Sequence, residues 1–567
     1  MATRPVWTHQ YATGDPIGLE PTHQTAQSMW LAARARHPEG VFLRYFGSEI
    51  TFAQVDAWSD RLAAGWVSAG VEAGSRIALF LQNVPAFAIS LVAAWKIGSV
   101  AVPVNPMSKA KELDYVLRDS KPSVLITHPE LWRATGAPVI DRAGERRPLI
   151  LITHRDDFAS TALPEVFQAS PGGDSRAEPV ATEEVFRFTD FIERHVSTVT
   201  PAIATVLRDD PAVLTYTSGT TGTPKGAINT HGNIAFNTES SWRWIGLDAS
   251  DSILAVAPLF HVTGLVLHLG LSAFGTIPVV LTYRFDAPTM LDTLRQTRAT
   301  FAVGSITAFI ALLTEAMSDP AGTDKLSSLT KVLSGGAPVP SSVVDEFQQE
   351  TGLYIRNVYG LTETTSPVTS VPRGLRAPVD PRSGALSVGV PMYEYNVRIV
   401  GDDGYALPPG KVGEIAVTGP GVVPGYWMKP EETRNALRDG ELRTGDVGFM
   451  DDEGWLYVVD RKKDMIIASG YKVWPREVED VLYGHPGVLE AAVVGLPDDY
   501  RGERVGAFVV ARPGFTPTAE EIVTFCRQQI AAYKVPRRVQ FVTELPKTAT
   551  GKVLRRSLRS GSGIAPG

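Results

Sequence analysis

Short apolar runs alternate with helix-length amphipathic stretches along most of the chain, and this alternation constrains the fold more than any other feature. Strands that alternate with helices favour layered α/β domains built on largely parallel sheets. The early part of the sequence shows the pattern clearly, with strands expected at 76–81, 101–104 and 123–127 and helices expected at 86–98 and 111–119.

The pattern changes twice towards the C-terminus. Helical periodicity stops between Val388 and Tyr457, where short apolar runs between Gly and Asp turns predict a small β subdomain. After Arg461, a compact α+β unit is expected, with helices at 476–483 and 519–532 and strands at 488–494 and 503–511. Residues 159–184 lack apolar periodicity and are interpreted as a surface excursion.

The predicted fold is therefore α/β, with a large N-terminal domain and a small α+β C-terminal domain. Residues 1–460 form the first, made of two layered α/β subdomains plus the small β subdomain, and residues 461–567 form the second.

Charge and cysteine content exclude several classes of protein. The 567-residue chain has 54 Lys and Arg against 61 Asp and Glu, a net charge of −7, and no basic block. No nucleic-acid partner is expected, because phosphates need clustered cations. Cys526 is the single cysteine in the sequence, which excludes a disulfide framework, a thiolate zinc site and an iron–sulfur cluster.

No targeting or transmembrane segment is expected, and the sequence favours a cytoplasmic location. The first ten residues have no apolar core of signal-peptide length, and the last five carry no prenylation or peroxisomal signal. The most apolar stretch, 253–281, is long enough to span a bilayer, but Pro, Gly and His residues interrupt it. We interpret it as buried strands and loops.

The segment from Thr217 to Gly226 is the most informative for function. An apolar strand, 212–216, leads directly into a loop with five hydroxyls, three glycines and Lys225. Glycines let backbone N–H groups approach an anion, hydroxyls donate further bonds, and the lysine adds charge. The spacing is not that of a Walker A loop, in which Gly-Lys-Ser/Thr follows four spacer residues. A phosphate-binding loop is therefore predicted, with an ordinary flexible Ser/Thr/Gly loop as the alternative.

At this loop the chain resembles the adenylate-forming superfamily, which includes acyl- and aryl-CoA synthetases, luciferases and nonribosomal-peptide adenylation domains. Further segments resemble the other motifs of that family and occur in family order over residues 217–552. They are Tyr359-Gly-Leu-Thr-Glu363, Arg443-Thr-Gly-Asp446, Asp460-Arg-Lys-Lys-Asp464, Ser469-Gly-Tyr-Lys472 and Pro546-Lys-Thr-Ala-Thr-Gly-Lys552.

The resemblance implies an enzyme that uses ATP and Mg²⁺ to convert a carboxylic acid into an acyl-adenylate and then transfers the acyl group to CoA. It also implies that the C-terminal domain is mobile. The expected partners are small molecules, with a carrier protein as the alternative acyl acceptor and a homodimer as an open possibility. Luciferase-like oxidation and a nucleotide-binding regulator without turnover are the rival activities.

The resemblance also assigns roles to individual residues. Tyr359 would stack on adenine, Thr362 would contact the α-phosphate, and Glu363 would bind Mg²⁺, in keeping with the one or two protein carboxylates that Mg²⁺ usually takes. Asp446 would accept hydrogen bonds from the ribose, and Lys552 would bridge the substrate carboxylate and the phosphoryl oxygens.

The other implied positions surround these residues. Arg461 would be a second ribose or phosphate contact, Lys463 would be the hinge, and Gly470 would leave room for the pantetheine arm of CoA. The rest of the implied nucleotide and CoA site consists of Thr217, Ser218, Gly219, Thr220, Thr221, Gly222, Lys225, Gly335, Gly336, Ala337, Gly360 and Lys472.

The carboxylate pocket is expected near Pro258-Leu-Phe-His261, which resembles the acyl- and aryl-CoA synthetase version of this segment. Amino-acid-activating relatives carry an aspartate near this part of the pocket, and its absence here would leave an α-ammonium unpaired. A core histidine bonded to backbone is the alternative for His261. Trp242, Trp244, Phe260 and Tyr283 could line an apolar pocket or belong to the core. A medium- or long-chain fatty acid is the favoured substrate, with an aryl or arylpropanoid acid as the alternative.

Overall fold

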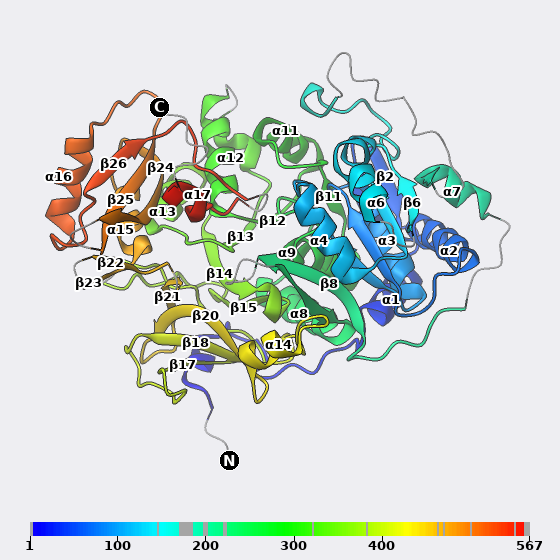
Figure 1. Ribbon diagram of the computed structural model, residues 1–567, viewed down its shortest axis with the longest axis horizontal. Helices are drawn as coiled ribbons and strands as arrows, with labels where there is room; N and C mark the ends of the chain where they lie inside the picture. The colour runs from blue at the N-terminus through cyan, green and yellow to red at the C-terminus, as the bar shows by residue number, and fades with distance from the viewer. Residues whose placement is uncertain are drawn as a thin grey trace.

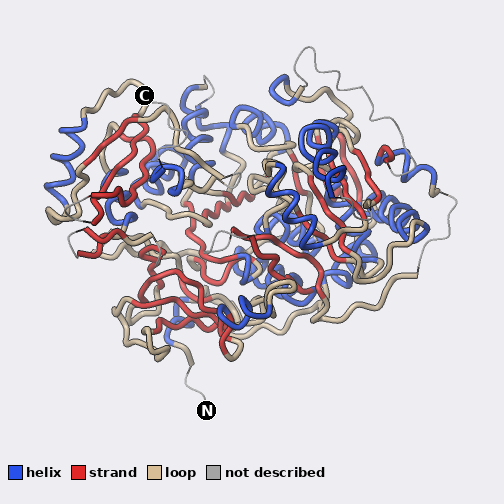
Figure 2. The backbone as a smooth tube through the Cα atoms, in the orientation of Figure 1, coloured by secondary structure: helices blue, strands red, loops and turns tan. Residues whose placement is uncertain are grey.

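The computed structural model describes residues 4–143, 147–168, 185–196, 202–218, 224–319, 322–381, 384–461, 464–468, 471–498, 502–548 and 551–560. Figure 1 shows the N-terminal α/β layers beside a β subdomain, with the C-terminal unit against α12 and α13. Helices flank the sheets of the α/β layers (Figure 2). The predicted fold class is confirmed.

The first sheet contains the strand that leads into the predicted phosphate loop. Its strands are parallel except for the hairpin β8–β9. In spatial order they are β7 (Val185–Arg187), β6 (Leu149–Ile152), β5 (Val124–Thr127), β3 (Arg76–Phe80), β4 (Val100–Pro103), β8 (Pro211–Ser218) and β9 (Pro224–Thr230).

Helices cover both faces of this sheet, which explains why its strands are continuously apolar. Ile77 and Leu79 of β3 pack in the cluster that contains α2 and α3, whereas Ala78 and Phe80 pack with α4 and α6. Successive side chains of a strand point to opposite faces, so each face of β3 has its own helical layer.

The second sheet carries the cavity described below. Its spatial order is β16 (Val390–Pro391), β15 (Ser366–Ser370), β14 (Ile355–Leu361), β13 (Lys331–Gly335), β12 (Phe301–Gly304), β10 (Ile253–Leu254), β11 (Val279–Leu281), β1 (Val41–Tyr45) and β2 (Ser48–Thr51). Neighbouring strands from β14 to β1 pair in parallel, so their carboxyl ends lie along one edge. Ligands of open α/β sheets bind at that edge.

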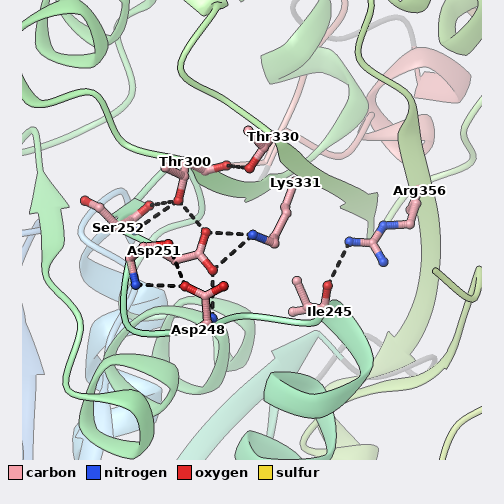
Figure 3. A network of polar contacts seen from close by, with 9 residues as sticks. Ile245, Asp248, Asp251, Ser252, Thr300, Thr330, Lys331 and Arg356 are labelled. Carbon is pink, nitrogen blue, oxygen red and sulfur yellow. Dashed lines mark hydrogen bonds and ion pairs between the residues drawn. The ribbon is translucent and has the colours of Figure 1, made fainter. Parts of the chain in front are cut away.

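A polar network connects the amino ends of strands in this sheet, at the edge opposite the cavity (Figure 3). Asp251, just before β10, accepts hydrogen bonds from Lys331 Nζ at 2.8 and 3.0 Å and from Thr300 Oγ1 at 2.7 Å. Arg356 of β14 donates to the carbonyl of Ile245 at the end of α8 (His231–Ile245). Because the network joins the amino ends of the strands, away from the cavity, we assign it to stability.

The β subdomain and the C-terminal unit have separate sheets. The β subdomain contains β17 (Asn396–Val400), β18 (Gly413–Thr418), β20 (Glu441–Met450), β19 (Leu437–Arg438) and β21 (Leu456–Arg461). The C-terminal sheet contains β23 (Tyr471–Val473), β22 (Ile466–Ala468), β25 (Gly502–Ala511), β24 (Val488–Asp498) and β26 (Arg538–Phe541). This sheet packs with α15 and α16 on its own core, in which burial raises the pKa of Cys526 to about 11. The domain boundary at residue 460 remains a prediction.

The helices complete the layers. They are α1 (Ala26–Arg36), α2 (Phe52–Ser68), α3 (Pro85–Lys96), α4 (Ala110–Ser120), α5 (Pro129–Leu131), α6 (Ala137–Ala143), α7 (Phe188–Arg194), α8, α9 (Val262–Gly264), α10 (Leu271–Gly275), α11 (Ala287–Thr297), α12 (Ile306–Ser318), α13 (Ser341–Thr351), α14 (Pro430–Ala436), α15 (Pro475–Tyr483), α16 (Ala519–Gln529) and α17 (Arg555–Ser560).

Three local predictions were wrong. Residues 262–275 are helical rather than strands and loops, because a short buried apolar run does not reveal its period. The β subdomain contains one short helix, α14, which begins with a proline at its first position. The strands on either side of the predicted phosphate loop are longer than expected, since β8 and β9 pair as far as Ser218 and Pro224.

Candidate functional site

A cavity of about 770 Å³ opens at the carboxyl ends of β10, β12, β13 and β14. Residues on its wall come from the strand ends, from α12 and from the C-terminal unit, so the cavity lies between the two parts of the chain. Six of the residues to which the resemblance assigns a place in the site line it together: His261, Gly335, Gly336, Gly360, Thr362 and Lys552.

Lys552 reaches this cavity from a tight turn of the C-terminal unit. Its amide donates to Thr548 Oγ1 at 3.1 Å, and its carbonyl accepts from the Thr548 amide at 2.7 Å. Thr307, at the start of α12, donates to the carbonyl of Gly551 at 3.2 Å and so anchors the turn to the N-terminal part.

Gly336 provides the space into which the lysine extends. A Cβ at this position would lie 3.4 Å from Cε of Lys552, and the φ of Gly336 is +77°. Any other residue would therefore be strained in its backbone, and its Cβ would come into van der Waals contact with the lysine.

His261 faces the cavity as a neutral imidazole. Burial, with a further contribution from the charge of Lys552, lowers its pKa from 6.5 to about 3. Its Nδ1 accepts a hydrogen bond from the Thr263 amide at 3.2 Å, so the proton of the neutral ring is assigned to Nε2. His261 can therefore donate one hydrogen bond without adding a charge.

Tyr359 and Asp446 meet next to the cavity although they come from different sheets. The Tyr359 hydroxyl donates to Asp446 Oδ2 at 2.9 Å, and Asp446 is buried within β20. Asp446 pairs in register with Arg461 of β21, which brings the backbones of these two predicted nucleotide residues together.

Glu363 follows β14 in a short 3₁₀ turn, 362–364, and its carboxylate is held by a neighbour. The Tyr426 hydroxyl donates to Glu363 Oε1 at 2.8 Å, and the Val423 amide donates to the Glu363 carbonyl at 2.9 Å. Within the described ranges, no group of three or more His, Cys, Asp and Glu side chains could hold a metal. The donor set fits Mg²⁺ carried largely by nucleotide phosphates, with Glu363 as a protein ligand.

The predicted phosphate loop connects β8 to β9. Thr217 pairs with Lys225, and the Lys225 ammonium lies 5.2 Å from the ring centroid of Tyr426. Gly219, Thr220, Thr221 and Gly222 fall outside the described residues, as do Lys463 and Gly470. The side chains of Ser218, Arg461 and Lys472 are likewise not described, and Ala337 is not on the cavity wall.

Sequence reasoning missed two buried asparagines that hold the segment after Glu363. Asn229 Nδ2 donates to the Thr362 carbonyl at 3.1 Å and to Thr365 Oγ1 at 2.9 Å. Asn237 Nδ2 donates to the Thr364 carbonyl at 3.1 Å and to the Thr365 carbonyl at 2.6 Å. These bonds stabilise Thr365 and Ser366, whose φ values of +55° and +85° are costly for residues with a side chain.

The four aromatic residues for which the sequence left pocket lining and core packing open divide between the two. Phe260 lines the cavity, whereas Trp242, Trp244 and Tyr283 do not. Trp244 packs edge-on against Tyr393 in the core, and Tyr283 donates to Glu130. Large aromatic side chains commonly pack in the core, which was the alternative interpretation. The structure favours core packing for Trp242, Trp244 and Tyr283.

These features are those of an enzyme of the adenylate-forming class: a Thr/Gly-rich hairpin, a buried acid beside a tyrosine, and a lysine that reaches the cavity from a second unit. A family model described as "AMP-binding enzyme" matches residues 30–427, and one described as "AMP-binding enzyme C-terminal domain" matches residues 477–552. The chain belongs to the AMP-binding enzyme family.

Similar proteins cover nearly the whole chain. A long-chain-fatty-acid–CoA ligase of Bacillus subtilis (strain 168) is 35% identical over 98% of both chains. A feruloyl-CoA synthase of Amycolatopsis sp is 36% identical over 94% of this chain and 98% of its own. The crystal structure of the anthranilate CoA ligase AuaEII in complex with anthranoyl-AMP has a TM-score of 0.83 at 27% identity, covering 96% of this chain and 98% of its own. In the described part of the chain, no helix is long and apolar enough to cross a membrane.

Proposed function

We propose that the chain is an ATP-dependent carboxylic acid–CoA ligase. In the first half-reaction a carboxylate attacks the α-phosphate of ATP, forming acyl-AMP and releasing pyrophosphate. In the second, the thiol of CoA attacks the acyl carbon and AMP leaves. Both carboxylate and triphosphate are anions, so the first step requires cations placed between them before reaction.

One observation carries this proposal: Lys552, from the C-terminal unit, lines the same cavity as His261 and Thr362. An ammonium at this point can neutralise the charge that builds on the carboxylate and phosphoryl oxygens as they approach. His261 is neutral, and its Nε2–H can orient the carboxylate without competing for that charge. Thr362 supplies a hydroxyl to the α-phosphate.

The nucleotide is held by the residues around this point. Tyr359 offers its ring to adenine and Asp446 its carboxylate to the ribose, with Arg461 beside it in register. The hairpin from Thr217 to Lys225 binds the β- and γ-phosphates. Glu363 would hold Mg²⁺ together with the nucleotide phosphates, and the metal would stabilise the negative charge of the pyrophosphate leaving group.

The remaining assignments concern the second half-reaction. Gly470 and Lys472 lie in the segment expected to face the site when CoA reacts, with Lys463 as the hinge. A cytoplasmic location supplies both ATP and CoA. A homodimer would be revealed by size measurement. A carrier protein is the alternative acyl acceptor, and acceptor assays would reveal it.

The acid is proposed to be a medium- or long-chain fatty acid. The wall around His261 includes Val256, Phe260, Val262, Val303, Ala308 and Ile310, which suits an alkyl chain. The similarity to a long-chain-fatty-acid–CoA ligase supports this substrate class. An aryl or arylpropanoid acid is the second candidate, favoured by the similarity to a feruloyl-CoA synthase.

The test is pyrophosphate release from ATP with a panel of alkyl and aryl acids, with and without CoA, and mass spectrometry of the thioester. Release that depends on one class of acid, with a CoA thioester as product, is the expected result. Adenylate formation without thioester would indicate a carrier-protein acceptor. No release with any acid would contradict the ligase proposal.

A further inference from the structure

The segment that contains Tyr426 connects the β subdomain to the hairpin β8–β9. The Ile228 amide donates to the Gly425 carbonyl at 3.0 Å, and the Trp427 amide donates to the Gly226 carbonyl at 2.8 Å. These bonds form an isolated antiparallel β-bridge between the segment and β9, with Ala227 opposite Tyr426. The Tyr426 amide donates to Thr433 Oγ1 of α14 at 3.0 Å. The backbone of Tyr426 is therefore fixed relative to the hairpin.

The side chain of Tyr426 contacts two groups of the proposed nucleotide site. Its hydroxyl donates to Glu363 Oε1 at 2.8 Å, and its ring lies 5.2 Å from the Lys225 ammonium. A tyrosine hydroxyl has one proton to donate, so Glu363 Oε2 is left for another partner. The ring face attracts the ammonium through its quadrupole.

The Tyr426 phenol carries one proton and donates it in the hydrogen bond to the Glu363 carboxylate. The hydrogen bond from the Tyr426 hydroxyl fixes Oε1 of Glu363, whose side chain would otherwise rotate among several rotamers. Partners of this kind, which orient a metal ligand from outside the coordination sphere, commonly contribute ~10–100-fold to metal affinity or activity.

We propose that Tyr426 is a positioning residue that orients the metal-binding carboxylate of Glu363 and the phosphate-binding ammonium of Lys225 relative to each other. The inference rests on the proposed function, because it assigns Mg²⁺ and phosphates to those two groups. Tyr426 itself touches neither substrate nor metal in this account. It acts through the hydroxyl on one partner and through the ring on the other.

The two contacts can be separated by substitution. Tyr426→Phe keeps the ring under Lys225 and removes only the hydroxyl that orients Glu363. Tyr426→Leu removes both. Tyr457→Phe is the matched control, because the Tyr457 hydroxyl also donates to a carboxylate, Asp451 Oδ2 at 3.2 Å, and the Tyr457 ring also packs closely, on Phe449.

The experiment is equilibrium binding of ATP by calorimetry at increasing Mg²⁺ concentration, on the full-length protein without acid or CoA. Tyr426→Phe should raise the Mg²⁺ concentration at half-maximal binding ~10-fold while leaving ATP affinity at saturating Mg²⁺ within ~3-fold of wild type. Tyr426→Leu should show the same Mg²⁺ shift and in addition weaken ATP at saturating Mg²⁺. Tyr457→Phe should match wild type in both.

The midpoint in Mg²⁺ does not depend on the fraction of folded protein, so partial unfolding of a variant lowers the amplitude without moving it. An unchanged midpoint for Tyr426→Phe would overturn the inference, as would equal shifts for Tyr426→Phe and Tyr457→Phe. If wild type binds ATP with a Mg²⁺ dependence, the proposed nucleotide site stands whatever the variants do. If wild type binds no ATP, the proposed function and this inference both fail.

Discussion

The ammonium of Lys552 extends over Gly336 from a turn that Thr548 and Thr307 hold in place. Its charge is required when the carboxylate meets the α-phosphate and not when a thiol attacks the finished adenylate. We expect Lys552→Ala to slow adenylation by roughly 10²–10³-fold, about 3–4 kcal/mol, by analogy with the loss of one oxyanion donor. Thioester formation from supplied acyl-adenylate should stay largely intact, as measured by separate assays of the two half-reactions.

Lys547→Ala is the matched control for this prediction. Lys547 also lines the cavity, but its ammonium lies 2.6 Å from Glu490 Oε1, so its charge is already compensated. Its loss should change adenylation far less than the loss of Lys552. Equal damage to both half-reactions by Lys552→Ala would refute the role assigned to this lysine.

His261 is predicted to act on the acid and not on the nucleotide. His261→Ala should raise the KM for the acid or change the preference among acids, while the KM for ATP changes little, because the ring lines the cavity wall near Phe260. Steady-state kinetics with each substrate varied separately would measure this. A collapse of ATP affinity would instead assign the residue to the nucleotide site or to the core.

The pH dependence of His261 follows from its low pKa of about 3. Since the ring stays neutral between about pH 5 and 9, kcat/KM for the acid should change with pH in parallel for wild type and His261→Ala. For stability the sign is opposite to that of a salt-bridged histidine. On acidification from 6.5 towards 3, the unfolded chain takes up a proton that the folded protein does not, so this residue lowers stability in that window.

Residue chemistry predicted part of the site and missed another part for a physical reason. The motif residues His261, Thr362 and Lys552, identified by resemblance, lie in one cavity. Asn229, Asn237 and Tyr426 carry no such signal, because their roles arise from backbone groups and side chains far away in sequence. Asn229, for example, contacts Thr362 only because β9 and the end of β14 are brought together by two different sheets.

At the scale of elements, strands buried on both faces were the easiest to predict. β3, β4 and β5 match the predicted segments closely, since their apolar runs are short and end at turn residues. The helical segment after His261 was missed because it is apolar on all sides. Its glycines allow close approach of α8: a Cβ at Gly270 would lie 2.5 Å from Thr238 Oγ1, and one at Gly275 would lie 1.9 Å from the Trp242 ring.

The linker between β21 and β22 is the element in which we predict the hinge. Proline at position 463 would fix φ near roughly −65° and restrict Lys462 as well. We expect Lys463→Pro to keep ATP–pyrophosphate exchange near wild type and to slow CoA thioester formation by at least ~100-fold, about 2.7 kcal/mol. The two half-reactions are measured separately on the purified proteins.

Lys463→Ala is the control for the hinge, because it removes the same side chain without restricting the backbone. It should behave like wild type in both half-reactions. If Lys463→Pro forms the thioester at the normal rate, the pivot lies elsewhere or the domain need not turn.

At the scale of the whole molecule, the C-terminal unit contacts the N-terminal part both beside the linker and at α13. Near the linker, Arg476 donates to the carbonyls of Val458 and Leu386, and Arg555 donates to Asp460 Oδ1 at 3.1 Å. At α13, Arg512 makes a bidentate ion pair with Glu346, at 2.6 and 3.0 Å. Glu346 belongs to the N-terminal part and Arg512 to the C-terminal unit, so we expect a rotation of the C-terminal unit about the linker to separate them.

The pair Arg512–Glu346 should therefore stabilise the domain orientation in which Lys552 lines the cavity. It should not stabilise the orientation expected for the reaction with CoA. Both side chains are about one-third exposed, at 32% and 33%, which limits the contribution of the pair to about 1 kcal/mol, or roughly fivefold in rate.

Glu346→Arg should slow adenylation about fivefold and leave thioester formation from supplied acyl-adenylate unchanged or faster. The double variant Glu346→Arg with Arg512→Glu should restore adenylation, because it rebuilds the pair with its charges exchanged. Arg398→Glu breaks a similar pair with Glu441 inside the β subdomain and should leave both half-reactions unchanged. If the double variant fails to recover activity, the effect of Glu346→Arg comes from local packing of α13 and not from the attraction between the two units.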